Sequence, residues 1–298
     1  MRILRLLLGL TLGLTICGTA TAQAADPIVA AAGDIACARG QAATATKCAQ
    51  KRTSDLVPPA DVVLALGDNQ YSSGSYPNYT ASYAPTWGLF FSITNPIPGN
   101  HEYGASGAAG YFQYFGARAG AKGKGWYSFE IGAWHVIAIN SECNRLSGAC
   151  RVGGAQESFV RADLAAHPNA CTLAYWHEPR FSSGAAAVTH AAAMAPIWND
   201  LYDANADLVL SAHKHAYERF APLNKSGAVD SVRGMREIIA GTGGEDHAGG
   251  ARKITGSEVR NNSTFGALKL TLHPTGYDWR FMPEPGKTFT DSGSTACH

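Results

Sequence analysis

The stretch Asp61–Tyr71, with the sequence DVVLALGDNQY, most constrains the fold of this chain. Its first half is a short run rich in Val and Leu, which is typical of a strand buried on both faces of a parallel sheet. Gly67 ends the run, and Asp68, Asn69 and Tyr71 follow it. Ligands usually bind at the carboxyl ends of such strands, so these polar groups are candidates for a site. For this stretch alone, the alternative is an Asx-turn with Tyr71 packed as an ordinary aromatic.

Four other apolar runs also end in polar side chains that can bind a ligand or a metal ion. The first, PIVAAAGD, ends at Asp34, and a helix predicted over residues 50–57 separates it from the run before Asp68. This β-α-β order predicts adjacent parallel strands with a right-handed crossover, which would place the two carboxylates side by side. The other three runs end at Asn100 and His101, at His177, and at His213 and His215.

The rest of the chain predicts a second sheet. WYSFEIG and WHVIAIN, separated by a Gly-Ala turn, alternate as an antiparallel pair does. Helices are predicted over residues 156–166 and 190–205, and strands over 171–181 and 206–220. Residues 72–89 are predicted to be mainly loop with at most one short helix, and residues 111–127 to be loop. A meander over 235–242, 264–272 and 277–282 is predicted to complete the second sheet. The predicted fold class is therefore α/β, with two stacked mixed β-sheets flanked by helices in a single domain.

The N-terminus has the pattern of a secretory signal. Residues 1–24 carry Arg2 and Arg5, then LLLGLTLGLTICG, then small residues that end in an A-x-A site. The apolar run is shorter than the roughly 20 residues that span a bilayer, so we expect no membrane anchor. We therefore expect a signal peptide over 1–24 and a secreted domain, extracellular or periplasmic, over 25–298.

The cysteine count predicts disulfides in an exported chain. Of the seven cysteines, Cys17 belongs to the predicted signal, which leaves six. Six cysteines allow 15 pairings, and buried free thiols are the alternative. Proximity along the chain, and elimination for the last pair, favour Cys37 with Cys48, Cys143 with Cys150, and Cys171 with Cys297.

Charge and composition exclude one class of partner. The formal net charge is +1, only 16% of the residues are charged, and no basic stripe is present. A long nucleic acid held through its phosphates is therefore not expected. Substrate binding must then depend on a few local groups or on metal ions.

The side chains at the five strand ends comprise carboxylates, imidazoles, an amide and a phenol. A single His at a strand end is more often structural than a ligand, but the whole set offers more donors than one metal ion needs. It suits two ions that share one carboxylate, roughly 3.5 to 4 Å apart, as in two-metal hydrolases. His213 and His215 are two residues apart, so an extended segment would turn both imidazoles to the same side.

In this pattern the chain resembles the calcineurin-type metallophosphoesterases, and among them the purple acid phosphatases. Five blocks, GDIA, GDNQY, GNHE, YWHE and AHKH, occur in family order between residues 33 and 215, and the tyrosine of GDNQY is the mark of the purple type. The resemblance implies a ferric ion bound by Asp34, Asp68, Tyr71 and His215. It implies a divalent partner (Fe, Zn or Mn) bound by Asp68, Asn100, His177 and His213, with Asp68 as the bridge.

The resemblance also implies two catalytic histidines. His101 would contact the phosphate or protonate the leaving group, and His190 would be a second substrate histidine. The chain departs from the family at Ala36 and Ala212, where the family usually has Gly; both residues are small, so the departures concern backbone shape more than ligation. A phenol with an ordinary pKa near 10 loses its proton most readily to a strongly Lewis-acidic ion, so Tyr71 favours a trivalent first metal.

Together these features predict a secreted, metal-dependent phosphoric ester hydrolase. We expect an acid or alkaline phosphatase that hydrolyses small phosphomonoesters by attack of a metal-bound hydroxide. A phosphodiesterase or nucleotidase is the alternative within the enzymes, because it would use the same metal site and differ in loops such as 72–83 and 104–125. A non-catalytic exported metal-binding protein is the alternative from another class, and the complete ligand set disfavours it.

Overall fold

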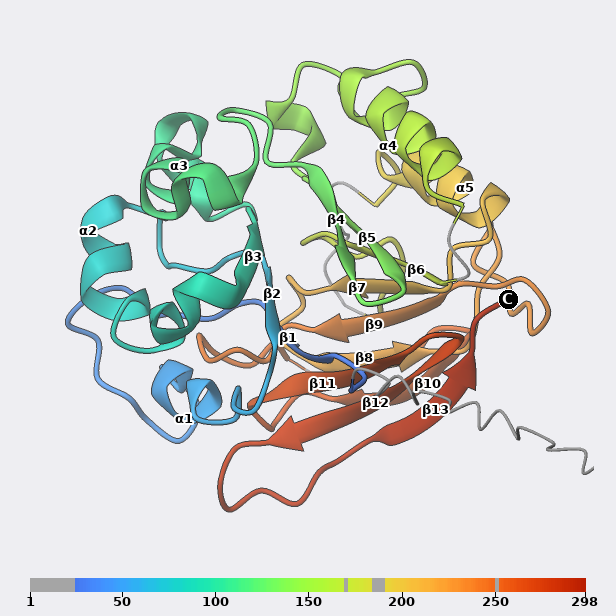
Figure 1. The fold of residues 1–298 in the computed structure, drawn as a ribbon. Coiled ribbons are helices and arrows are strands. Elements are labelled where there is room, and N and C mark those ends of the chain that lie inside the picture. Colours follow the sequence, from blue (N-terminus) through green and yellow to red (C-terminus); the bar gives the residue numbers. More distant parts are fainter. Residues whose placement is uncertain (1–24, 169–170, 184–190, 250–251) are drawn as a thin grey trace, which may run out of the picture.

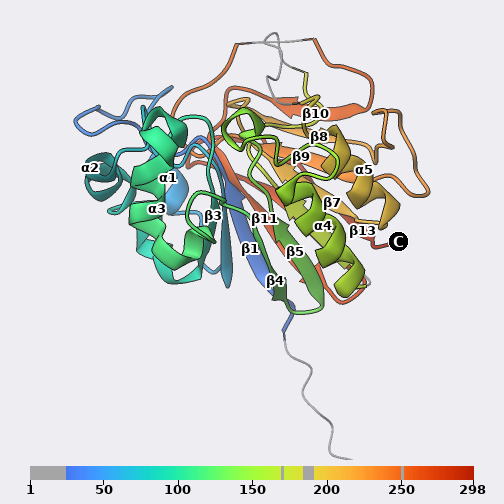
Figure 2. The same ribbon diagram turned by 90° about the horizontal axis from the view of Figure 1, so that it is seen from above.

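A computed structural model describes residues 25–168, 171–183, 191–249 and 252–298; the predicted signal segment and His190 lie outside these residues. Two mixed β-sheets lie face to face, and helices flank the sandwich on both sides (Figures 1 and 2). This confirms the predicted two-sheet α/β architecture. On the side of the first sheet lie α1 (Gln50–Ser54), α2 (Tyr76–Asn78) and α3 (Ala109–Phe115), and on the side of the second lie α4 (Ala155–Ala166) and α5 (Ala195–Asp203).

The first sheet has six strands in the order β13-β12-β11-β1-β2-β3. They are β1 (Ile28–Ala32), β2 (Val62–Leu66), β3 (Thr94–Ile97), β11 (Gly266–His273), β12 (Gly276–Pro283) and β13 (Ser292–Ala296). β1 pairs in parallel with β2, and β2 with β3, as the β-α-β order predicted. Because both faces of β1 and β2 are buried, their sequences are almost wholly apolar.

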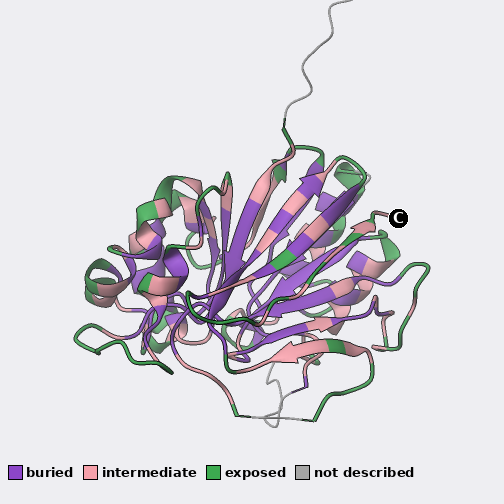
Figure 3. Ribbon diagram, turned by 90° about the horizontal axis from the view of Figure 1, so that it is seen from below, coloured by how far each residue is buried: buried purple, intermediate pink, exposed green. Residues whose placement is uncertain are grey.

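The second sheet has seven strands in the order β10-β8-β9-β7-β6-β5-β4. They are β4 (Tyr127–Ile131), β5 (Trp134–Ala138), β6 (Cys171–Tyr175), β7 (Leu208–Ser211), β8 (Tyr217–Phe220), β9 (Arg236–Ala240) and β10 (Ser257–Asn261). β4 and β5 form the predicted antiparallel pair, whereas β5, β6, β7 and β9 are parallel neighbours. The central strands of both sheets are mostly buried, whereas the edge strands β4, β10 and β13 are largely intermediate or exposed (Figure 3).

Two hydrophobic cores follow from this layering. The larger includes residues of both sheets and of α4 and α5, and contains Trp134, Trp176 and Trp198. The smaller includes residues of β1, β2 and α3, and contains Tyr79 and Phe115. Both cores exclude water from the strands whose carboxyl ends carry the predicted site.

The predicted meander was partly assigned to the wrong sheet. β9 lies in the second sheet, as expected, but β11 and β12 belong to the first, where β11 pairs antiparallel with β1. Leu268, Leu270 and Leu272 of β11 alternate into the main core, which both sheets line. An alternating pattern shows that one face of a strand is buried, but it does not show which sheet the strand joins. Without β11, the edge of β1 would be left unpaired.

The two segments predicted as mainly loop contain more helix than expected. Residues 72–89 hold α2, a π-helical turn over Tyr79–Tyr83 and the start of a 3₁₀ segment over Trp87–Ile93. Residues 111–127 begin inside α3, whose Tyr111 and Phe115 are buried in the smaller core. Burial of these aromatics outweighs the weak intrinsic helix propensity of Gly and aromatic residues.

The predicted disulfide scheme is confirmed. The Cα–Cα distances of 5.4, 5.6 and 5.5 Å suit disulfide geometry, and the pairs are Cys37–Cys48, Cys143–Cys150 and Cys171–Cys297. The first two close short loops, while the third joins residues 126 positions apart.

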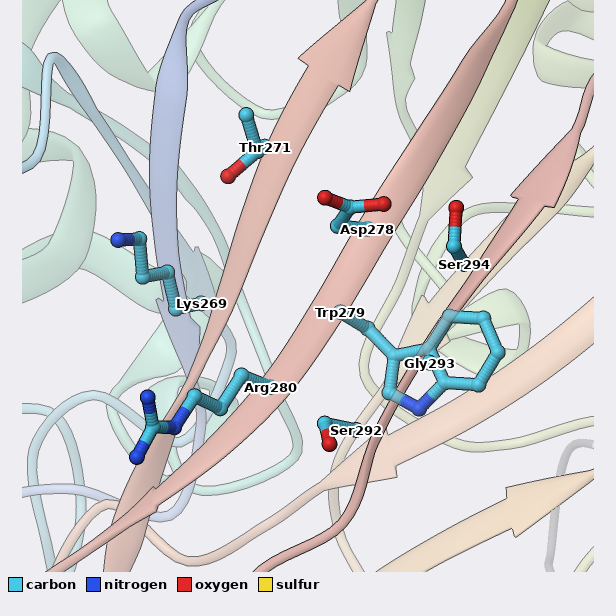
Figure 4. Close-up of a pocket in the computed structure, with 8 residues that line it drawn as sticks. All are labelled: Lys269, Thr271, Asp278, Trp279, Arg280, Ser292, Gly293 and Ser294. Atoms are coloured by element: carbon cyan, nitrogen blue, oxygen red, sulfur yellow. The ribbon is translucent and has the colours of Figure 1, made fainter.

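The part of the first sheet formed by β11, β12 and β13 carries a pocket with charged side chains in its lining (Figure 4). Lys269, Thr271, Asp278 and Arg280 line it. In β11 the leucines that alternate with Lys269 and Thr271 lie in the main core, so this pocket faces away from that core. In the described part of the chain, every helix is too short or too polar to span a membrane.

Candidate metal centre

Polar side chains that follow β1, β2, β3, β6 and β7 converge where the carboxyl ends of these strands meet. The structure joins all seven predicted metal ligands in one network of close contacts: Asp34, Asp68, Tyr71, Asn100, His177, His213 and His215. Ligands from both sheets contribute, so the network spans the sandwich. Their role as ligands stays a prediction, which the geometry below supports.

Tyr71 lies at the centre of the first group of ligand atoms. Its hydroxyl oxygen is 2.7 Å from Asp34 Oδ1, 2.9 Å from Asp68 Oδ2 and 3.1 Å from His215 Nε2. His215 Nε2 is also 3.3 Å from Asp34 Oδ1. Bonds of roughly 2 Å from each atom could reach one ion at this position. Three oxygens and one imidazole nitrogen therefore face a single small volume.

The second group shares Asp68 with the first. Asp68 Oδ2 lies 3.2 Å from His177 Nε2, and Asn100 Oδ1 lies 3.2 Å from the same nitrogen and 3.0 Å from His213 Nδ1. The two imidazole nitrogens are 3.3 Å apart. Two nitrogen lone pairs this close repel each other unless a proton or a cation lies between them. Asp68 is thus positioned to bridge the two groups.

Four of the seven side chains start from a left-handed backbone. The φ angles are 56° at Asp34, 46° at Asp68, 65° at His213 and 42° at His215. Residues other than Gly rarely adopt this conformation, which costs on the order of 1–3 kcal/mol each and clusters at functional sites. The finding also corrects the prediction of one strand over 206–220. The two histidines lie in a bend between β7 and β8, so His213 faces the second group and His215 the first.

Glycines leave the space that the ligand side chains occupy. A Cβ atom at Gly67 would lie 2.7 Å from the ring of His177, and one at Gly241 would lie 2.5 Å from Asp34 Oδ2. The two departures from the family pattern cause no such conflict, because neither Ala36 nor Ala212 has a positive φ. The methyl group of Ala212 lies where a Cβ atom on residue 33 would collide with it, and residue 33 is a glycine.

The donor set fits metal ions. Asp34 Oδ2 is buried and has no hydrogen-bond partner among the described residues, which is costly for a carboxylate unless a cation contacts it. His177 Nδ1 donates to the carbonyl of Leu66 at 2.9 Å, so Nε2 is the nitrogen left free to bind an ion in the second group. Carboxylate, amide, phenol and imidazole ligands together suit iron, zinc or manganese.

Without a cation, protons must occupy this site. Burial lowers the pKa of His177 and of His215, but the carboxylates of Asp68 and Asp34 outweigh burial and raise these values to about 10 and about 11. Burial, and then the charge of His177, lowers the pKa of His213 to about 4. Burial and the two carboxylates raise the pKa of Tyr71 well above 10. A metal ion would reverse these effects by displacing the protons.

His101 lies at the rim of the site. Its Nδ1 is 2.6 Å from the carbonyl oxygen of Ser72, and its Nε2 is 3.9 Å from Asp68 Oδ2. Its ring lies 4.2 Å from that of Tyr71, and its side chain is 35% exposed, whereas the Asp68 side chain is 1% exposed. A substrate can therefore reach His101. The other predicted catalytic histidine, His190, lies outside the described residues.

Sequence reasoning missed two carboxylates that support the ligands. Glu102 is buried and accepts hydrogen bonds from the N–H groups of Asn69, Gln70 and Gly99 at 3.0, 3.2 and 2.7 Å, which ties the loop after β2 to the loop after β3. Its place in the GNHE block was the available signal. Asp246, after β9, contacts His215 Nδ1, and its Gly-rich surroundings in the sequence gave no comparable signal.

A two-sheet α/β sandwich with two ligand groups that share an aspartate at the strand ends has the architecture of a metallophosphoesterase. The sequence pattern of the calcineurin-like phosphoesterase family matches residues 28–217, and the chain belongs to this family. The match covers the strands and loops that carry all seven predicted ligands.

Similar proteins include purple and other acid phosphatases. Purple acid phosphatase 15 of Arabidopsis thaliana is 27% identical over 194 residues, which are 53% of this chain and 36% of that protein. Acid phosphatase A of Cryphonectria parasitica is 29% identical over 169 residues, 49% of this chain and 34% of that protein. The chain thus spans about a third of the length of these relatives. The fold resembles a purple acid phosphatase from yellow lupin (Lupinus luteus) seeds, with a TM-score of 0.73 at 17% identity over 92% of this chain and 54% of that one.

Proposed function

We propose that this chain is a secreted phosphatase of the purple type that hydrolyses small phosphomonoesters at a site of two metal ions. One observation carries the proposal: Asp68 Oδ2 lies 2.9 Å from the Tyr71 hydroxyl in one ligand group and 3.2 Å from His177 Nε2 in the other. A ferric ion would be held by Asp34, Asp68, Tyr71 and His215, and a divalent ion (Fe, Zn or Mn) by Asp68, Asn100, His177 and His213.

Bound ions would supply Lewis acidity and an activated water at this site. The chain itself holds the reacting groups in place and moves the proton. The carbonyl of Ser72 accepts the Nδ1–H of His101 at 2.6 Å, which directs Nε2 toward the site. A protonated His101 could then donate from Nε2 to the leaving oxygen. His190 is proposed as a second histidine that contacts the phosphate.

Two features support secretion. The predicted signal over residues 1–24 has the n-region, h-region and cleavage site of an exported chain. The disulfides Cys37–Cys48, Cys143–Cys150 and Cys171–Cys297 are typical of proteins that fold in an oxidising compartment.

The test is hydrolysis of p-nitrophenyl phosphate and bis(p-nitrophenyl) phosphate from acid to alkaline pH, with metal analysis of the same sample. Faster hydrolysis of the monoester, with two metal ions per chain, is the expected result. A preference for the diester would move the assignment to a phosphodiesterase or nucleotidase. Two bound metals with no hydrolysis of either ester would indicate a non-catalytic metal-binding protein.

Asp68→Ala tests the bridging role directly. Because it removes the one oxygen atom common to both groups, we expect loss of both ions and a fall in activity of roughly 10³-fold or more. His273→Ala is the control, because His273 pairs with Asp26 beside the first residues of β1, at the opposite end from Asp34. It should keep the metals and the activity of the wild type.

A further inference from the structure

Both ring nitrogens of His215 contact neighbouring side chains. Its Nε2 faces the first ligand group, 3.1 Å from the Tyr71 hydroxyl and 3.3 Å from Asp34 Oδ1. Its Nδ1 hydrogen-bonds Asp246 Oδ1. Because a carboxylate oxygen can only accept when ionised, the hydrogen of this bond belongs to Nδ1. Nε2 is then the nitrogen that remains for a metal ion.

Asp246 is itself fixed by the surrounding backbone. Lys47 and Asp246 form an isolated antiparallel β-bridge. The neighbouring Glu245 accepts from the N–H of Cys48 at 3.0 Å and donates its own N–H to the carbonyl of Asp34 at 2.9 Å. Cys48, the residue after Lys47, also forms a disulfide with Cys37. The backbone of Asp246 is therefore held by neighbouring segments of the chain, and its carboxylate is directed at His215.

We propose that Asp246 is a positioning residue, which holds the hydrogen of His215 on Nδ1 and orients the ring so that Nε2 points at the first metal position. The part of this inference that concerns metal binding rests on the proposed function. Partners of this kind fix the orientation of a metal-binding imidazole and raise its basicity. A carboxylate behind His215 also adds negative charge next to the first position, which favours a trivalent ion there over a divalent one.

The two predicted metal positions then differ in their supporting groups. His177, a predicted ligand of the second ion, uses the neutral carbonyl of Leu66 at 2.9 Å for the same purpose. His215 uses a carboxylate instead. This difference matches the higher charge proposed for the first ion.

Glu245 provides a matched control from the same loop. Its Oε2 lies 3.8 Å from His215 Nδ1, beyond hydrogen-bond distance, and its Oε1 is 3.2 Å from Lys47 Nζ. Glu245 also hydrogen-bonds the Asp246 side chain. Glu245→Gln therefore removes a neighbouring charge but keeps a hydrogen-bonding group there and leaves the acceptor for His215 in place. Asp246→Ala removes the acceptor, and Asp246→Asn keeps an acceptor oxygen without the charge.

The first readout is the Nδ1–H proton of His215, followed by NMR in the metal-free protein and in the zinc-loaded protein. We expect a strongly downfield, slowly exchanging signal in the wild type and in Glu245→Gln, and its loss in Asp246→Ala. The second readout is iron affinity, measured by competition with a chelator. We expect a fall of about 10- to 100-fold in Asp246→Ala, and a smaller fall in Asp246→Asn.

A persisting Nδ1–H signal together with wild-type iron affinity in Asp246→Ala would overturn the proposal. If Asp246→Ala does not fold, Asp246→Asn is tested in its place. The proposal then requires that Asp246→Asn binds iron more weakly than Glu245→Gln does. If the wild type binds neither iron nor zinc, the proposed function fails. The NMR signal of the metal-free protein still decides whether Asp246 holds the hydrogen of His215.

Discussion

Asp68 has little freedom to move. Its Oδ1 accepts the N–H of His101 at 2.8 Å, and its Oδ2 lies 2.9 Å from the hydroxyl of Tyr71 and 3.2 Å from His177 Nε2. The missing Cβ of Gly99 leaves the space that Oδ1 occupies. Both proposed ions depend on this one carboxylate, so small displacements of Asp68 should affect both.

Gly99→Ala is predicted to displace Asp68 and to release both metal ions. A Cβ at this position would overlap Asp68 Oδ1 and would lie 2.5 Å from the Asp68 backbone nitrogen. Gly249→Ala is the matched control, because a Cβ there meets nothing within 4 Å. Metal analysis and activity of the two purified variants make the comparison. Full metal content in Gly99→Ala would show that the loop after β3 can shift without disturbing Asp68.

Tyr71→Phe is predicted to remove the visible colour of the iron-loaded protein. If Tyr71 binds a ferric ion as phenolate, charge transfer from ring to metal colours the wild type, and the substitution removes only the oxygen. Asp34, Asp68 and His215 still offer three ligands, so part of the activity should survive with a divalent replacement. The absorption spectrum and the iron content are the measurements. A colourless iron-loaded wild type, with full iron content in Tyr71→Phe, would leave a tyrosine-independent two-metal site.

The sequence predicted which side chains meet at this site, but not how neighbouring groups support them. Each predicted ligand follows a short apolar run, and parallel strands bring the ends of such runs together. Glu102 and Asp246 act through hydrogen bonds to residues far away in the sequence, as in the contact of Asp246 with His215. The left-handed φ of His213 could not be predicted either, because an alternating sequence does not distinguish one strand from two strands joined by a bend.

At the scale of elements, strands buried on both faces were easier to place than a strand with one buried face. β1 and β2 are apolar on both faces, so their sequences identify them as neighbours in a buried sheet. β11 shows the simple alternation of a strand with one buried face, and either sheet could have buried its leucines. α3 was missed because burial of its aromatic residues in the smaller core stabilises the helix. That core forms only when the whole domain folds.

β4, β5 and α4 are linked by one buried histidine. His135 of β5 lies 2.7 Å from Glu130 Oε1 of β4 and 2.7 Å from Asp163 Oδ2 of α4. The ring of His167 stacks on it at 4.4 Å with an interplanar angle of 11°. Parallel rings cannot both direct in-plane lone pairs at one ion, so this cluster is suited to an ion pair and not to a metal. It connects α4 to its sheet.

This ion pair predicts greater stability at mildly acid pH than at alkaline pH. Burial lowers the pKa of His135, but hydrogen bonds to Asp163 and Glu130 outweigh it and raise the pKa above 6.5. Burial raises the pKa of Asp163, but its hydrogen bonds to His135 and Ser128 lower the pKa below 3.8. The His135 contribution is complete below pH 6.5 and is lost as pH rises through the raised pKa. The Asp163 contribution is present above pH 3.8 and is lost as pH falls through the lowered pKa.

The measurement is the free energy of unfolding of the wild type and of His135→Gln at several pH values. We expect the largest loss on substitution between pH 3.8 and 6.5, where both partners are charged in the folded and unfolded chain. The loss should shrink as pH rises further. A difference that is constant with pH, or that grows toward alkaline pH, would show that His135 contributes through packing alone.

At the scale of the whole molecule, the site depends on the two sheets keeping their relative position. Asp34 and Tyr71 come from the first sheet, whereas His177 and His215 come from the second. The disulfide Cys171–Cys297 links β6 of the second sheet to the end of β13 in the first. Cys171 begins β6 and His177 follows its end, so the covalent link and the ligand groups lie at opposite ends of this strand.

Loop length predicts that this disulfide stabilises the protein most. It joins residues 126 positions apart, whereas Cys143 and Cys150 are only 7 apart. By loop-closure entropy, the double substitution Cys171→Ala/Cys297→Ala should lower the free energy of unfolding by about 5 kcal/mol, against about 2 kcal/mol for Cys143→Ala/Cys150→Ala. Guanidinium unfolding of the metal-free proteins measures the difference without a contribution from metal binding. Equal losses in the two double variants would mean that local packing, and not restriction of the unfolded chain, determines what these disulfides contribute.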